Sequence, residues 1–104
     1  MSVKAVDSEF FDSEVLEAEL PVLVDFYADW CGPCMMLSPT VEKIAESHPE
    51  KYKVCKVNVD NSPELAVRFG IDTIPALLVF KGGRLTCRSV GVKPLDGIID
   101  MLEG

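Results

Sequence analysis

Trp-Cys-Gly-Pro-Cys, at residues 30–34, joins an apolar segment typical of a strand to an amphipathic segment typical of a helix. Pro33 suits the first turn of a helix, where a backbone N–H has no partner to lose. Gly32 removes side-chain bulk between the two sulfurs. If the helix begins here, the Cys31 sulfur lies over unpaired N–H groups that favour a thiolate, while Cys34 faces inward. The spacing therefore predicts an exposed, attacking Cys31 and a protected Cys34.

The segment before this motif, residues 21–27, is apolar on both faces except for Asp25. Such a pattern is typical of a central strand in a sheet covered on both sides. A buried carboxylate is unfavourable when ionised, so we expect burial to raise the pKa of Asp25. The alternative is an aspartate at a sheet edge with an ordinary hydrogen bond.

Apolar periodicity and turn signals extend this pattern along the chain. The expected strands are 3–6, 21–27, 52–59, 76–80 and 85–90. The expected helices run from Ser8 or Asp12 to Ala18, from Cys31 or Pro33 to His48, from Pro63 to about Gly70, and from Pro94 onward. Pro39 should kink the second helix. The Gly82-Gly83 pair predicts an antiparallel hairpin, so the sheet is expected to be mixed, with helices on both faces.

Composition narrows the classes of function. A chain of 104 residues with 48% hydrophobic residues fits one compact domain, residues 1–104. Its net charge of −7 disfavours nucleic acid and anionic membrane surfaces as partners. Neither a membrane span nor a signal peptide is visible, and four cysteines are too few for a disulfide scaffold of this size. We therefore expect a cytoplasmic, reducing location and a role for the cysteine pair in chemistry.

Several further segments match one family in the same order along the chain. The matching segments are Val24-Asp25-Phe26, Trp30 to Cys34, Pro39, Lys56 to Asp60, Thr73-Ile74-Pro75, Phe80 to Gly83 and Val90-Gly91. The chain thus resembles the thioredoxin family over nearly its whole length. The resemblance implies an α/β thioredoxin fold, a mixed sheet of about five strands flanked by about four helices. It also implies a monomeric protein-disulfide reductase without a cofactor, which acts on disulfide-containing proteins and is recharged by a thioredoxin reductase.

The resemblance assigns roles to residues. Cys31 attacks a partner disulfide, Cys34 resolves the mixed disulfide, and a Cys31–Cys34 disulfide remains. Asp25 accepts the proton of Cys34, and Lys56 modulates the pKa of that acid. The uncharged Gly32 and Pro33 between the cysteines favour a reductant over an oxidant.

The resemblance also predicts an apolar rim around Cys31, with a cis peptide bond before Pro75. The rim residues are Trp30, Thr73, Ile74, Pro75, Val90, Gly91 and Val92. Plain core packing is the alternative for Ile74 and Val90. A free Ile74 backbone would pair with an extended partner segment, as in strand addition.

Other interpretations of the cysteine pair and of the fold remain open. The cysteine pair also fits a structural disulfide or half of a zinc site, although Cys55, Cys87 and His48 form no second ligand pair. The fold also serves as a binding module, or as an oxidase or isomerase of an oxidising compartment. Met35 departs from the family pattern, because many bacterial members carry a lysine there. We expect this difference to affect which partners the protein binds.

Overall fold

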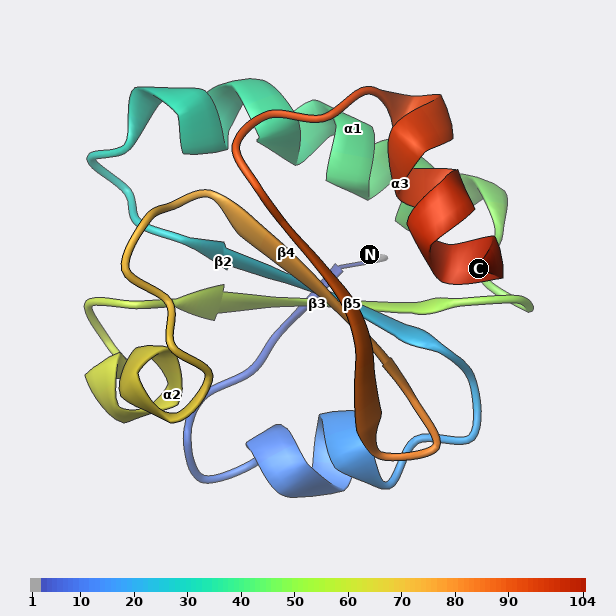
Figure 1. Cartoon of the computed structure of the whole chain (residues 1–104), viewed down its shortest axis with the longest axis horizontal. Helices are drawn as coiled ribbons and strands as arrows, with labels where there is room; N and C mark the ends of the chain where they lie inside the picture. The colour runs from blue at the N-terminus through green and yellow to red at the C-terminus, as the bar shows by residue number, and fades with distance from the viewer. Residues whose placement is uncertain (1–2) are drawn as a thin grey trace.

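A central sheet with helices on both faces organises the computed structural model, which describes residues 3–104 (Figure 1). Within these residues there are five strands and four helices. In chain order they are β1 (Val3–Ala5), η1 (Asp12–Leu16), β2 (Val22–Tyr27), α1 (Gly32–Ser47), β3 (Lys53–Asn58), α2 (Pro63–Arg68), β4 (Ala76–Lys81), β5 (Arg84–Val90) and α3 (Leu95–Glu103). The expected α/β class is confirmed.

The sheet is mixed, as the sequence predicts. Its strand order is β1-β3-β2-β4-β5, with β1, β3 and β2 parallel and the last two pairings antiparallel. Gly82 and Gly83 connect β4 to β5 with φ values of 58° and 81°. Two consecutive positive φ values are what the favoured two-residue hairpin turn requires, and glycine adopts them without steric cost. The predicted antiparallel hairpin is therefore confirmed.

The two faces of the sheet carry separate cores. In Figure 1, α1 and α3 lie on one side of the strands, while η1, drawn in blue, and α2 lie on the other. Leu37, Val41 and Ile44 of α1 pack with Ile98 and Leu102 of α3. The other core contains four aromatic rings, in which Phe69 contacts the rings of Phe11, Phe26 and Phe80. Strand β2 is buried between both cores, so its end is held rigidly.

Most differences from the expected boundaries are of one or two residues. The first helix is shorter than predicted: it begins at Asp12, the later of the two proposed starts, and ends at Leu16. Its last turn is wide, because the N–H of Glu17 bonds to the carbonyl of Asp12. Helix α1 continues past Pro39, which lies exposed on its outer face; the predicted kink stays a prediction. None of the helices among residues 3–104 is long and apolar enough to cross a membrane.

Two neighbouring residues of α1 allow a test of which face of the helix stabilises the folded protein. Leu37 is fully buried against the sheet, whereas its neighbour Met36 is exposed. We expect Leu37→Ala to lower the free energy of unfolding by about 2–5 kcal/mol, through lost burial and the cavity left behind. Met36→Ala should change it by less than about 0.5 kcal/mol. Chemical denaturation of both oxidised variants measures the difference, and equal effects would contradict the observed packing.

Candidate redox site

The cysteine motif forms the junction between β2 and α1. After β2, the N–H of Cys31 bonds to the carbonyl of Ala28 at 3.2 Å, which closes a tight turn. Cys31 then caps α1 in an extended conformation, and its Sγ accepts the N–H of Cys34 at 3.2 Å. Pro33 stands in the first helical turn, as predicted. The sulfur of Cys31 therefore lies at the positive end of the helix, where a thiolate is stabilised.

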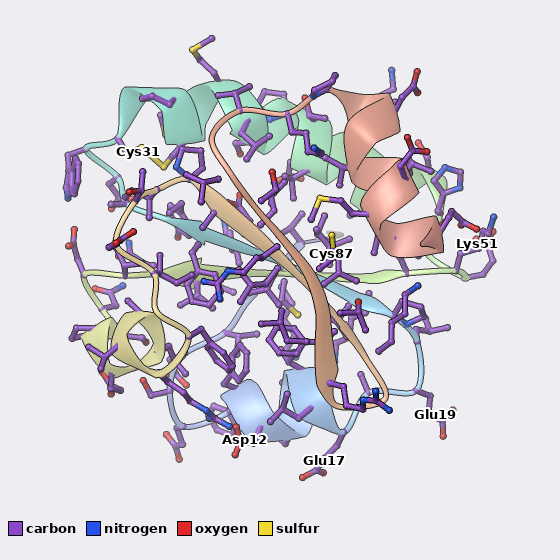
Figure 2. All side chains as sticks on the ribbon, in the orientation of Figure 1. Asp12, Glu17, Glu19, Cys31, Lys51 and Cys87 are labelled. Atoms are coloured by element: carbon purple, nitrogen blue, oxygen red, sulfur yellow. A yellow bond between two sulfur atoms is a disulfide. The ribbon has the colours of Figure 1, made fainter. Side chains whose placement is uncertain are left out.

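Cys31 and Cys34 form a disulfide, with their Cα atoms 5.2 Å apart. Both residues are buried, with 5% of Cys31 and 2% of Cys34 accessible. The prediction of an exposed Cys31 is therefore wrong for this oxidised state. The physical reason is that its sulfur is bonded inward to Cys34 and packs beside Ala28 and Ile74. Figure 2 shows Cys31 at the beginning of α1, at one end of the molecule.

A second segment reaches the disulfide from the loop before β4. The Ile74–Pro75 peptide bond is cis, as the resemblance implied. The carbonyl oxygen of Ile74 lies 3.9 Å from the Sγ of Cys31. The carbonyl of Pro75 accepts the N–H of Gly91 at 2.8 Å, and this bond ties the segment after β5 to the same place. Three stretches far apart in sequence thus meet around one sulfur.

The thioredoxin family model matches residues 2–104, which is nearly the whole chain. The chain belongs to the thioredoxin family. Given its Cys31–Cys34 disulfide, it is a protein-disulfide oxidoreductase that works by thiol–disulfide exchange. Its partners are, in general terms, disulfide-containing substrates and a reductase.

Relatives with thioredoxin names cover most of the chain. Thioredoxin 1 of Nostoc sp. is 46% identical over 98 residues, which cover 94% of this chain and 92% of that protein. A thioredoxin of Pyropia yezoensis is 47% identical over 103 residues, or 99% of this chain and 96% of its own. The chloroplastic M-type thioredoxin of Chlamydomonas reinhardtii is 43% identical, and the match covers 95% of this chain and 71% of that protein.

Most residues of the predicted rim are exposed or half-buried. Trp30 is 72% accessible, Val90 and Val92 are exposed, and Ile74 and Gly91 are half-buried. Thr73 is exposed beside Ile74, and its hydroxyl donates to Asp72 at 3.3 Å. Pro75 does not join the exposed rim, because it is buried directly before β4. We call the other six residues the redox rim: Trp30, Thr73, Ile74, Val90, Gly91 and Val92.

Asp25 lies buried in β2, directly beside Lys56 in the register of β3. Alternation along β2 directs it toward the face covered by α1, the same face as Leu23. Its Oδ1 is buried and has no hydrogen-bond partner among residues 3–104. Burial raises the pKa of Asp25 from 3.8 to about 7, and the Lys56 ammonium partly opposes that rise. The expectation of a raised pKa is confirmed, and the sheet-edge alternative is wrong.

Asp60 is a site residue that was not singled out from the sequence. Its Oδ2 accepts the indole N–H of Trp30 at 2.9 Å. The side chain of Asn58 in turn accepts the N–H of Asp60 at 2.9 Å, which fixes the loop after β3. The available signals were its position just after an expected strand and its place in the family-matching segment Lys56 to Asp60. This contact fixes the orientation of the exposed indole.

The two remaining cysteines lie apart from the disulfide. Cys55 is fully buried in β3, and burial raises the pKa of its thiol to about 11. Cys55 is therefore an inert thiol, because little thiolate forms at neutral pH. Cys87 is half-buried on β5 and packs on the core beneath α1 and α3 (Figure 2).

Replacing Asp25 should stabilise the folded protein in a pH-dependent way. Because its folded pKa exceeds the unfolded value, its contribution to stability is present below pH 4 and is lost as pH rises through about 7. Three pKa units at about 1.4 kcal/mol each give a cost of about 4 kcal/mol above pH 8. Asp25→Asn removes this cost. We therefore expect the substitution to raise the free energy of unfolding by most of this amount at pH 8.5 and by less than half of it at pH 5. Guanidinium unfolding at the two pH values measures it; a pH-independent gain would refute a buried, titrating carboxyl.

Proposed function

We propose that Cys31 is the attacking sulfur and Cys34 the resolving sulfur of a general protein-disulfide reductase. The Cys31 thiolate attacks one sulfur of a partner disulfide, and the other partner sulfur leaves as a thiolate that takes up a proton. The Cys34 thiolate then attacks the Cys31 sulfur, so that the partner leaves with both sulfurs reduced. Two electrons pass to the partner, and the Cys31–Cys34 disulfide remains. The hydrogen bond from the Cys34 N–H to the Cys31 sulfur is the observation that supports this order.

Asp25 accepts the proton that Cys34 loses in the second step. Lys56 adjusts the pKa of Asp25 and therefore the pH range in which Asp25 can accept that proton. A group with a pKa near 7 is half-ionised at neutral pH and so serves as an effective proton acceptor. The unpaired Oδ1 supports this role, since a buried oxygen without a partner is ready to receive a hydrogen bond. Gly32 and Pro33 contribute no charge, which keeps the site a reductant.

The partner is held by the redox rim. An extended partner segment pairs with the backbone beside the cis Ile74–Pro75 bond while its cysteine faces Cys31. A thioredoxin reductase then returns two electrons to the Cys31–Cys34 disulfide. We further propose that residues 1–104 act as one domain; the monomeric state and cytoplasmic location stay predictions.

Serine substitution separates the two sulfurs in an insulin-reduction assay driven by dithiothreitol. We expect both Cys31→Ser and Cys34→Ser to fall to the uncatalysed rate, because each lacks one half of the exchange. Only Cys34→Ser should accumulate a mixed disulfide with insulin, detected by mass spectrometry. Cys87→Ser is the control and should keep wild-type activity. Unchanged activity in Cys31→Ser would instead favour a binding module that uses the rim and not the sulfurs.

Asp25→Asn tests the proton acceptor in single-turnover kinetics. We expect the first attack to keep its rate, while release of the mixed disulfide slows by roughly tenfold or more at pH 7. In the wild type, the release rate should rise with pH through about 7 as the carboxyl ionises. Lys56→Met should move that midpoint upward, because the ammonium holds the pKa down. If Asp25→Asn releases the partner at full rate across pH, this role is wrong.

A further inference from the structure

The first half of α1 presents an uncharged outer surface. Residues 32–41 contain no charged side chain, whereas Glu42, Lys43 and Glu46 follow in the second half. Within the first half, Met35 is 59% accessible and Met36 is 70% accessible. The opposite face of α1 already packs into the core. Adjacent, solvent-exposed large apolar side chains are unusual on the outer face of such a helix.

These methionines follow the redox cysteines closely in the chain. The N–H of Met35 bonds to the carbonyl of Cys31 at 3.2 Å, so Met35 closes the turn that carries the reacting sulfur, and Met36 follows directly. Trp30, immediately before Cys31, is held in place by Asp60 and is mostly accessible. Exposed apolar side chains therefore stand on both sides of Cys31 along the chain, with Trp30 before it and Met35 and Met36 after it.

The charged groups around this surface are acidic. Asp29 precedes Trp30, Asp60 bonds to the indole, and Asp72 lies in the exposed loop beside Thr73. Lys93 follows the rim residue Val92, but its methylene chain runs along Gly97 of α3, where a Cβ would lie 3.0 Å from its Cε. An acidic partner segment would meet these carboxylates, and the first half of α1 carries no cation to offset them.

We infer that Met35 and Met36 form a second contact for the disulfide partner and select segments that are apolar and free of acidic residues beside the reacting cysteine. This inference rests on the proposed function, since it concerns the partner of the same sulfur. Methionine side chains are flexible and polarizable, so they adapt to apolar partner residues of different shape. Selection arises from apolar burial against α1 together with repulsion of acids by Asp29, Asp60 and Asp72.

Synthetic peptides test the selection directly. Three peptides, identical except for leucine, lysine or glutamate beside their single cysteine, are prepared as mixed disulfides with 2-thiopyridine. The reduced protein attacks the peptide sulfur, so that a Cys31–peptide disulfide forms and 2-thiopyridone leaves, which stopped-flow absorbance follows. We expect the second-order rate constant to fall in the order leucine, lysine, glutamate, with the first and last about tenfold apart.

A double variant and a matched control identify the residues responsible. In Met35→Lys/Met36→Lys, the rate with the leucine peptide should fall about three- to tenfold and the rate with the glutamate peptide should rise. Val67→Lys is the control: Val67 is 82% accessible and lies on α2, which covers the opposite face of the sheet. It should keep the wild-type order of the three peptides.

The outcomes distinguish this inference from the function on which it rests. Equal rates for all three peptides, or a peptide preference that survives the double lysine variant, would overturn the methionine contact while leaving the reductase intact. Failure of the wild type to release thiopyridone from any peptide faster than free cysteine does would instead overturn the proposed function. Circular dichroism of each variant verifies that a changed rate does not reflect lost folding.

Discussion

The chemistry of this protein depends on the hydrogen bond from the Cys34 N–H to the sulfur of Cys31 at the beginning of α1. That bond exists only because Cys31 is the capping residue, with its backbone extended and its side chain turned back over the first helical turn. A helix start leaves its first N–H groups without backbone partners, and here a sulfur receives one of them. The same turn that begins the helix therefore also stabilises negative charge on the sulfur.

The remaining architecture keeps that turn in position. Strand β2, buried between two cores, holds the turn from one side, and the packing of Leu37 and its neighbours holds α1 from the other. The loop before β4 closes the third side through the carbonyl of Ile74. Beneath α1, the sheet keeps Asp25 away from water at a considerable cost in stability, with Lys56 as its one charged neighbour in the register. Burying Asp25 thus lowers the stability of the folded protein, and it also provides the raised pKa that the proposed proton transfer needs.

Much of this arrangement could be predicted from local sequence. Apolar periodicity, the Gly82-Gly83 pair and the prolines at helix starts gave the element order, because each reflects a constraint within a few residues. Asp25 stood out because a lone acid in an apolar strand has few physical explanations. The Asp60 contact with Trp30 was missed because it joins two loops 30 positions apart, and no pattern within either loop encodes it. The burial of Cys31 and Pro75 was likewise missed, since both depend on tertiary contacts around the disulfide.

The bond between Trp30 and Asp60 has a practical consequence. Trp30 is the only tryptophan in the chain, and it is fixed next to the first cysteine of the motif. All indole emission of the protein therefore originates at the edge where electrons are exchanged. The intensity and wavelength of this emission therefore report only on the surroundings of Trp30, next to the redox cysteines. The protein thus carries an intrinsic optical reporter that needs no attached dye.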